Sequence, residues 1–257
     1  MIIKSFTVNV EKERIFGIYL VPPKKPTNIP LILTHGSGDN SNQYPLVHLS
    51  KFLTKKGYLT VRFDFRGCGN SDGKEENYSL SSQIKDLEVV IDFIKRKTRK
   101  RSVGIVAKSV SCVPAFIVVS KRGDISFIIA LGAPYNIEKY WSKEELEEVK
   151  KRGYIFYKGF RYGWKYAWEM SNFQKKYIEV LKKIKVPTLL IYGEKDEKVS
   201  LDEAKAVFST LGSKEKKLQI IKNSDHSFKL DEKNLKDLEK AILSFMKEIK
   251  KQCSFFV

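Results

Sequence analysis

The chain has 257 residues and 42% hydrophobic side chains, enough for a single α/β domain with a well-packed core. Lysine and arginine outnumber aspartate and glutamate by 48 to 30, which gives a formal net charge of +18. The lysines are spread along the whole chain and no nucleic-acid-binding motif accompanies them, so we expect a lysine-rich solvated surface and no nucleic-acid partner. No apolar run reaches the roughly 18 residues that a transmembrane helix needs, so none is predicted.

The N-terminal half alternates short apolar runs with amphipathic stretches. Ser5–Val10 and Arg14–Val21 predict a β-hairpin, and the polar, alternating start of the chain is not typical of a signal peptide. We therefore expect a cytoplasmic protein. After the proline-rich connection Pro22–Pro30, strands are predicted at Leu31–Thr34, Leu59–Phe65 and Val103–Ala107, and helices at Asn42–Lys56, Ser79–Lys97 and from Ser109 to Ser120.

The C-terminal half continues the alternation after one interruption. Strands are predicted at Phe127–Leu131, Val186–Tyr192 and Leu218–Ile221, and helices at Leu201–Leu211 and Asn234–Lys250. Strands that alternate with helices are typical of the α/β class, and they predict a mostly parallel, doubly wound sheet.

The interruption covers residues 136–185, where no clear strand is present. It holds all three tryptophans, Trp141, Trp164 and Trp168, among many other aromatic residues. We interpret it as an aromatic-rich helical cap inserted into a single domain (residues 1–257), whose core comprises residues 1–135 and 186–257. An insertion between two strands lies above their carboxyl ends, where open α/β sheets bind ligands. We therefore expect Trp164 and Trp168 to influence substrate choice.

The cysteines and histidines limit the chemistry that the chain can support. The three cysteines are widely spaced and no cysteine–histidine cluster is present, so neither a disulfide framework nor a zinc site is predicted, and no metal or cofactor is expected. The candidates for a general base are only three: His35, His48 and His226.

Ser109 is the candidate nucleophile. It follows a predicted strand and lies between Ala107 and Ser111, and small residues at these two positions are what a tight strand-to-helix turn requires. If Ser111 were the nucleophile, the β-branched Val113 would take the second flanking position and should clash. The spacing therefore favours Ser109.

Candidates for the acid and the base follow two later strands. Asp196 comes after Val186–Tyr192, with Glu194 as the alternative acid. His226 follows the last predicted strand by a short loop, as a mobile general base should. His48 lies within a predicted helix, and His35 lies in a His-Gly loop better suited to another role.

Acyl transfer also needs two backbone N–H groups aimed at the developing oxyanion. Val110, directly after the candidate nucleophile, would supply one of them. Ser37 would supply the other, because the glycines on both sides of it let the backbone approach closely.

A further stretch, Asp64–Gly73, resembles the D-x-R-G-x-G-x-S segment of the α/β-hydrolases. The resemblance is to the branch that holds cinnamoyl and feruloyl esterases, monoacylglycerol-lipase-like esterases and serine aminopeptidase-like (S33) proteins, and it covers nearly the whole chain outside residues 136–185. The chain order serine, aspartate, histidine is also that of this superfamily. The chain departs from the usual pattern at four positions: Ala107 and Ser111 replace glycines, Lys108 precedes the serine, and Cys68 lies in the loop.

The resemblance implies an α/β-hydrolase fold and a Ser109–Asp196–His226 triad that acts through an acyl-enzyme, with backbone donors at Ser37 and Val110. The leading hypothesis is a carboxylesterase for small to medium, apolar or aromatic acyl esters, with a small-molecule ester as its partner. A peptidase or an acyltransferase on the same triad stays open, as does a non-catalytic binding protein with a relic site. The sequence does not decide whether the chain forms a homo-oligomer.

Overall fold

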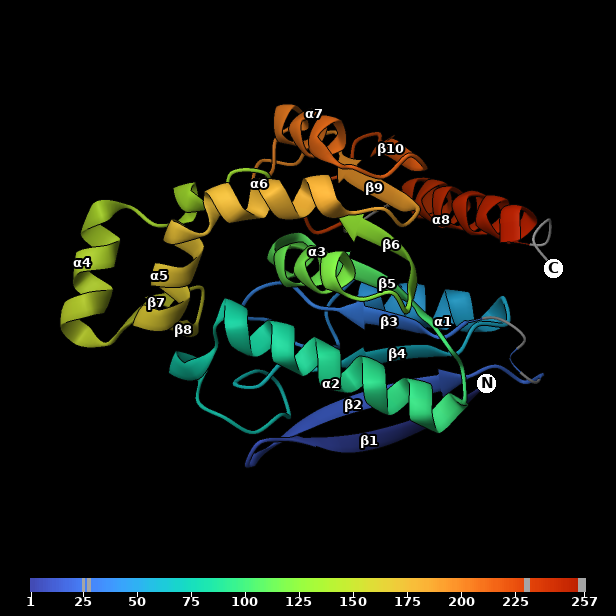
Figure 1. The fold of residues 1–257 in the computed structure, drawn as a ribbon, viewed down its shortest axis with the longest axis horizontal. Coiled ribbons are helices and arrows are strands. Elements are labelled where there is room, and N and C mark those ends of the chain that lie inside the picture. Colours follow the sequence, from blue (N-terminus) through green and yellow to red (C-terminus); the bar gives the residue numbers. More distant parts are fainter. Residues whose placement is uncertain (25, 27–28, 229–231, 254–257) are drawn as a thin grey trace.

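The computed structural model describes residues 1–24, 26, 29–228 and 232–253, and within these ranges eight strands form one sheet (Figure 1). The strand order is β1-β2-β4-β3-β5-β6-β9-β10, and all neighbours from β4 to β10 pair in parallel, whereas β1 and β2 are antiparallel. The prediction of a mostly parallel α/β sheet is therefore confirmed. The strands are β1 (Ile2–Val10), β2 (Glu13–Val21), β3 (Leu31–Thr34), β4 (Thr60–Phe63), β5 (Val103–Lys108), β6 (Ile125–Leu131), β9 (Thr188–Gly193) and β10 (Lys216–Ile221).

Helices cover both faces of the sheet. Because successive side chains of a strand point to opposite faces, each central strand serves two apolar layers, and Ile105 packs in one layer while Val106 packs in the other. One face carries α2 (Leu80–Thr98), α3 (Cys112–Lys121), α6 (Gln174–Lys183) and α7 (Leu201–Thr210), and the opposite face carries α1 (Leu46–Lys55) and α8 (Glu232–Cys253) (Figure 1). Of the helices described, none has both the length and the apolar composition needed to cross a bilayer.

The first helix is shorter than expected. The sequence predicted Asn42–Lys56, but α1 begins at Leu46. The proline at position 45 explains the difference, because a residue that precedes proline is disfavoured in the helical conformation, and Tyr44 is that residue.

The segment 136–185 contains a β-hairpin as well as helices, so the expectation that it holds no strand was wrong. Strands β7 (Tyr154–Tyr157) and β8 (Phe160–Gly163) pair antiparallel between α4 (Lys143–Arg152) and α5 (Trp164–Asn172). The turn residues Lys158 and Gly159 both have positive φ angles, +51° and +80°, as a tight two-residue hairpin turn requires. Each strand has only four residues, too few for a visible alternation in the sequence.

Two buried polar contacts hold the Asp64–Gly73 loop on the core. Asp64 accepts hydrogen bonds from the backbone N–H groups of Ser41 (2.6 Å) and Asn70 (2.9 Å). Arg66 Nε donates to Asp86 Oδ1 at 2.7 Å, and the two side chains are only 9% and 0% exposed. Burial raises the pKa of Asp86 to about 6, against the lowering effect of Arg66. The Asp64–Gly73 motif therefore has a structural role, because its polar side chains hold the loop on the core.

The burial of this pair generates a stability prediction. Arg66→Met should lower the free energy of unfolding by about 3–5 kcal/mol, because it leaves the carboxylate of Asp86 buried without a counter-charge. Arg14→Met is the matched control: it breaks another arginine–aspartate pair, Arg14–Asp72, whose arginine is 65% exposed. The control should lose much less stability, because an exposed ion pair is solvated and contributes little. Urea unfolding of both variants measures the difference, and equal losses would contradict the structural role given to Arg66.

Candidate active site

Ser109 lies on a sharp turn between β5 and α3. Its φ angle is +57°, in the left-handed region, where a residue with a side chain is disfavoured by roughly 1–2 kcal/mol. The flanking residues Ala107 and Ser111 are fully buried under the turn. On the open side the nearest loop residue is Gly36, where a Cβ atom would lie 3.5 Å from the Ser109 Cβ. The turn thus presents the Ser109 hydroxyl at the carboxyl end of the sheet.

Ser111, the rejected alternative, is part of the interior. Its Oγ lies 2.8 Å from Thr34 Oγ1, which joins the turn to the end of β3, and its side chain is fully buried. A hydroxyl in this position has no access to a substrate.

Ser109, His226 and Asp196 form a continuous chain of short contacts. Ser109 Oγ lies 2.7 Å from His226 Nε2, and His226 Nδ1 lies 2.7 Å from Asp196 Oδ2. An ionised carboxylate can only accept, so the ring proton belongs on Nδ1 and leaves Nε2 free to accept from the serine. This tautomer is the one in which a histidine can take up a hydroxyl proton.

The loop after β9 holds Asp196 in place. Its side chain is 0% exposed, and Oδ1 accepts hydrogen bonds from the backbone N–H groups of Lys198 and Val199, both at 2.9 Å. The alternative acid, Glu194, is exposed and accepts a hydrogen bond from the backbone of Asn223. Of the two candidates, only Asp196 contacts the histidine.

Two glycines let the strand-end loops approach one another. A Cβ atom at Gly193 would clash with the carbonyl group of Ser224, in the loop that carries His226. Gly132 has a φ angle of +62°, and a Cβ atom there would lie 3.2 Å from His226 Cε1. Gly132 was not among the predicted site residues. Its position directly after the predicted strand Phe127–Leu131 nevertheless indicated a place where another loop could approach the backbone closely.

The other two histidines have structural contacts. His35 is fully buried, with Nδ1 2.8 Å from the Gly36 carbonyl oxygen and Nε2 accepting from the backbone N–H of Phe65 at 3.1 Å. Burial lowers the pKa of His35, so the ring stays neutral and joins two loops. His48 Nε2 lies 2.7 Å from Glu239 Oε1 and connects α1 with α8. Neither ring contacts Ser109.

The loop after β3 offers a backbone donor beside the serine. The N–H of Gly36 is already bound to Gln43 Oε1 at 3.0 Å. The next N–H, that of Ser37, has no hydrogen-bond acceptor among the residues that the structure describes. The second expected donor, Val110, is half-buried at the start of the turn into α3.

Cap tyrosines fasten the side chain of Ser37. Its Oγ lies 3.1 Å from the hydroxyl groups of both Tyr162, in β8, and Tyr166, in α5. Burial raises the pKa of Tyr162 to about 12 and that of Tyr166 further, so both hydroxyls stay protonated at neutral pH. The ring of Trp141 packs on both tyrosines, with centroid distances of 5.8 and 6.2 Å. These three aromatic residues therefore gather beside the loop that carries Ser37.

The expected influence of Trp164 and Trp168 on substrate choice stays a prediction, and both side chains are exposed. Their exposed fractions are 37% and 51%, whereas Tyr166 and Met170, on the other face of the same helix, are buried. The local sequence shows that α5 is aromatic, but only the packing decides which face turns inward.

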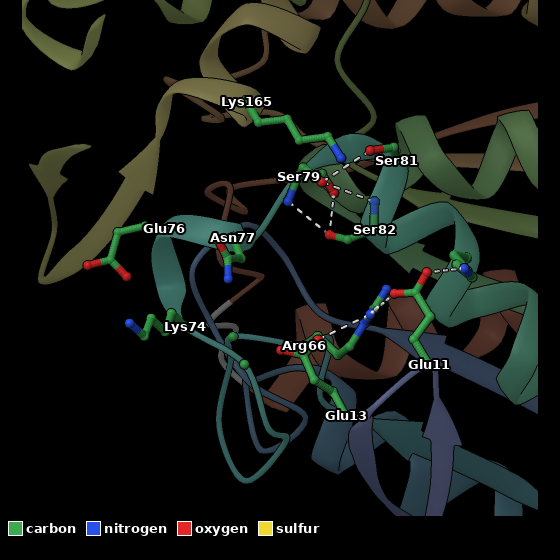
Figure 2. A pocket seen from close by; sticks show the side chains of 13 residues that line it. Glu11, Glu13, Arg66, Lys74, Glu76, Asn77, Ser79, Ser81, Ser82 and Lys165 are labelled. Atoms are coloured by element: carbon green, nitrogen blue, oxygen red, sulfur yellow. Dashed lines mark hydrogen bonds and ion pairs between the residues drawn. The ribbon is translucent and has the colours of Figure 1, made fainter. Parts of the chain in front are cut away.

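A cavity of about 460 Å³ lies elsewhere, at the start of α2 (Figure 2). Its charged groups largely neutralise one another, because Arg66 pairs with Glu11 and Glu13, and Lys85 also pairs with Glu11. Figure 2 shows the serines at this helix end bonded among themselves, with Ser79 accepting from Ser82. No residue of the Ser109 site lines this cavity.

Within the described ranges, no group of three or more His, Cys, Asp or Glu side chains is arranged to hold a metal ion. Cys68 and Cys112 are buried thiols, and burial raises the pKa of both.

The parallel sheet, the strained serine turn and the strand-end loops define the architecture of an α/β-hydrolase. A family model described as serine aminopeptidase, S33, matches residues 26–158 and 142–233. The chain therefore belongs to the serine aminopeptidase S33 family of hydrolases, in agreement with the resemblance seen in the sequence.

Solved structures with this fold include several esterases. Est1E from Butyrivibrio proteoclasticus, with ferulic acid bound, has a TM-score of 0.84 at 19% identity and covers 96% of this chain and 99% of its own. The monoacylglycerol lipase of Paleococcus ferrophilus has a TM-score of 0.75 at 17% identity, covering 91% of this chain and 99% of its own. At these identities the likeness shows the fold. Among curated proteins, an acyl transferase of Photobacterium phosphoreum is 23% identical over 237 residues, which is 85% of this chain and 76% of that protein.

The glycine contact with His226 generates a prediction about the site. Gly132→Ala should slow covalent labelling by a fluorophosphonate at least about tenfold, because the added methyl group displaces the histidine ring from the serine. Gly153→Ala is the matched control: its φ angle is also positive, +85°, but nothing lies within 4 Å of the added Cβ. The control should lose stability from backbone strain and label at the wild-type rate. Equal labelling rates in the two variants would show that Gly132 does not position His226.

Proposed function

We propose that the chain is a serine hydrolase that cleaves carboxylic esters of small to medium, apolar or aromatic acyl groups through an acyl-enzyme. The observation that carries the proposal is the unbroken contact chain from Ser109 through His226 to Asp196, with 2.7 Å at each step. Structural ion pairs of histidine and aspartate are common, but a third partner on a strained strand-to-helix turn is typical of a nucleophile.

The mechanism follows from the direction of these contacts. His226 Nε2 accepts the hydroxyl proton as Ser109 Oγ attacks the carbonyl carbon, and the π electrons of the C=O bond move to its oxygen. Asp196 holds the ring in the accepting tautomer and stabilises the imidazolium that forms. When the oxyanion collapses, the bond to the alcohol oxygen breaks and His226 protonates the leaving alcohol. Water then repeats the sequence on the acyl-enzyme and releases the acid.

The backbone N–H groups of Ser37 and Val110 would stabilise the oxyanion. Ser37 is suited to this role because its N–H has no acceptor within the part of the chain that the structure describes. Its side chain is held by two tyrosines, so the donor is oriented before the substrate arrives. A donor that is fixed in advance stabilises the transition state more than one that reorients during the reaction.

The preference for apolar or aromatic acyl groups rests on the cap. Ligand sites are lined mainly by apolar and aromatic side chains, and the rings of the half-buried Trp141 and the buried Tyr162 and Tyr166 gather beside the loop that carries Ser37. The ferulic acid bound to the structurally similar Est1E is itself an aromatic acid, which supports the same choice here.

Acyl transfer is the second candidate. The acyl transferase of Photobacterium phosphoreum aligns with 85% of this chain, and transfer needs only an acceptor other than water at the acyl-enzyme stage.

One experiment separates these candidates. The purified protein is assayed with p-nitrophenyl esters of increasing acyl length and with aminoacyl anilides, each with and without an added alcohol acceptor. Ester turnover that the acceptor leaves unchanged supports the hydrolase. A new acylated alcohol supports the transferase, and anilide turnover without ester preference supports a peptidase. Absence of turnover together with absence of fluorophosphonate labelling would contradict the proposal.

Ser109→Ala should reduce kcat by roughly four to six orders of magnitude, because the nucleophile is lost. Ser111→Ala is the control: it removes buried hydrogen bonds to Thr34 and to the backbone of Lys108, costs about 1–3 kcal/mol of stability and keeps substantial activity. Rates on p-nitrophenyl butyrate and melting temperatures are measured for both. An inactive Ser111→Ala protein beside an active Ser109→Ala protein would move the nucleophile.

Replacement of both cap hydroxyls, in Tyr162→Phe/Tyr166→Phe, should lower kcat about tenfold or more, because Ser37 loses the contacts that orient its N–H. The KM for an acetyl ester should change little, since the rings remain. The matched control, Tyr154→Phe, removes a hydroxyl from the cap strand β7 that is not bonded to Ser37. A loss confined to KM in the double variant would mean that these tyrosines only bind substrate.

A further inference from the structure

Three lysines converge on the site from different elements. Lys108 ends β5 directly before Ser109, Lys158 lies in the turn between β7 and β8, and Lys198 lies two residues after Asp196. The side chains of Lys158 and Lys198 lie against each other, and Lys108 and Lys198 are close enough to repel each other. Three like charges are thus gathered within one small region.

These lysines have no carboxylate partner in the described part of the chain. None of them forms an ion pair there, although many other lysines do. Lys108 is only 3% exposed, and burial lowers its pKa to about 8. A buried ammonium group that forms no ion pair is costly even where carboxylates lie in its surroundings, so an anionic ligand close to Lys108 would be favourable.

The carboxylates around Lys108 are committed to other groups. Asp196 contacts His226 and two backbone N–H groups. Asp225 accepts from Ser227 through both the backbone and the hydroxyl group, and Asp39 accepts from the backbone of Asn40. They moderate the positive charge of the region without pairing with its lysines.

The hairpin whose turn carries Lys158 contacts two loops of the site. On one side of the hairpin, Phe160 packs on the loop after β3, where a Cβ atom at Gly38 would lie 3.0 Å from the Phe160 Cβ. On the other side, Lys158 reaches Lys198 in the loop that holds Asp196. The hairpin therefore connects the loop after β3 with the loop that holds Asp196, and the lysine pair lies at the second of these contacts.

We infer that Lys158 and Lys198 form an anion-binding subsite, with Lys108 behind it, and that the natural substrate is an ester that carries a carboxylate or phosphate group. The inference rests on the proposed function, because the anion belongs to the ester that Ser109 attacks. Opposite charges at the mouth of a site raise substrate affinity and association rate, and both effects decline with salt.

Two matched pairs of esters test the inference and locate the charge. On the acyl side, mono-p-nitrophenyl glutarate is compared with p-nitrophenyl pentanoate. On the alcohol side, 4-acetoxybenzoate is compared with its methyl ester. In at least one pair, the wild-type protein should favour the anionic ester by about tenfold or more in kcat/KM, and the preference should shrink as NaCl rises from about 0.05 to 0.5 M.

The lysines are then removed in pairs. Lys158→Ala/Lys198→Ala should abolish the preference through a higher KM for the anionic ester, and kcat/KM for the neutral ester should change much less. Lys158→Arg/Lys198→Arg should retain it. Lys150→Ala/Lys165→Ala is the control, since it removes the same charge from exposed helix positions elsewhere in the cap. Equal turnover of both members in each pair by the wild-type protein, or a preference that survives the alanine pair, would overturn the inference.

Binding separates this inference from the proposed function. Glutaranilic acid is a stable anionic amide, and N-phenylpentanamide is its neutral counterpart. By calorimetry, the first should bind the Ser109→Ala protein about tenfold more tightly than the second, and the Lys158→Ala/Lys198→Ala substitutions should remove the difference. If no ester is turned over but this difference is seen, the hydrolase proposal fails and the anion subsite stands. For a charge on the alcohol side, 4-acetamidobenzoate and its methyl ester are compared in the same way. If the two members bind alike in both pairs, the anion subsite is excluded, whatever the turnover.

Discussion

The left-handed backbone at Ser109 is the constraint on which the rest of the site depends. A residue with a side chain adopts this conformation only where its surroundings hold it there, and here β5 on one side and α3 on the other supply that support. Because the serine is fixed at the carboxyl end of one strand, every group that acts with it has to arrive from the end of another. Asp196 follows β9, His226 follows β10, and Ser37 follows β3.

The loops at this end of the sheet are held by a second layer of polar contacts. Asp64 binds the backbone of Ser41, His35 joins its own loop to Phe65, and Arg66 is neutralised by the buried Asp86. These contacts take no part in the proposed reaction, but they determine where the backbone of Ser37 lies. The D-x-R-G motif is recognisable in the sequence because this architecture demands it.

The sequence predicted the sheet, and it singled out the three polar residues that the structure brings into contact, because their signals are local. Apolar β-branched runs identify strands such as Leu31–Thr34, and a serine between two small residues identifies a tight turn. The contacts of the cap could not be predicted, because they do not have local signals in the sequence. The four-residue strands β7 and β8 have no readable period, and the bonds from Ser37 to Tyr162 and Tyr166 join residues more than a hundred positions apart in the chain. Trp164 and Tyr166 cannot be distinguished in the sequence as candidate residues of the site. Only the packing shows that the ring of Trp164 is exposed and that of Tyr166 is buried.

The neighbouring positions of β6 and β9 in the sheet have a consequence for how such a protein diversifies. The chain leaves the sheet at the end of β6 and returns to it at β9, which pairs directly with β6. The whole segment between β6 and β9 therefore leaves and rejoins the sheet at two adjacent strands. The length of this segment can change without shifting the register of any strand. A cap of different size or composition could be exchanged at this point in one genetic event, while Ser109, Asp196 and His226 stay where they are.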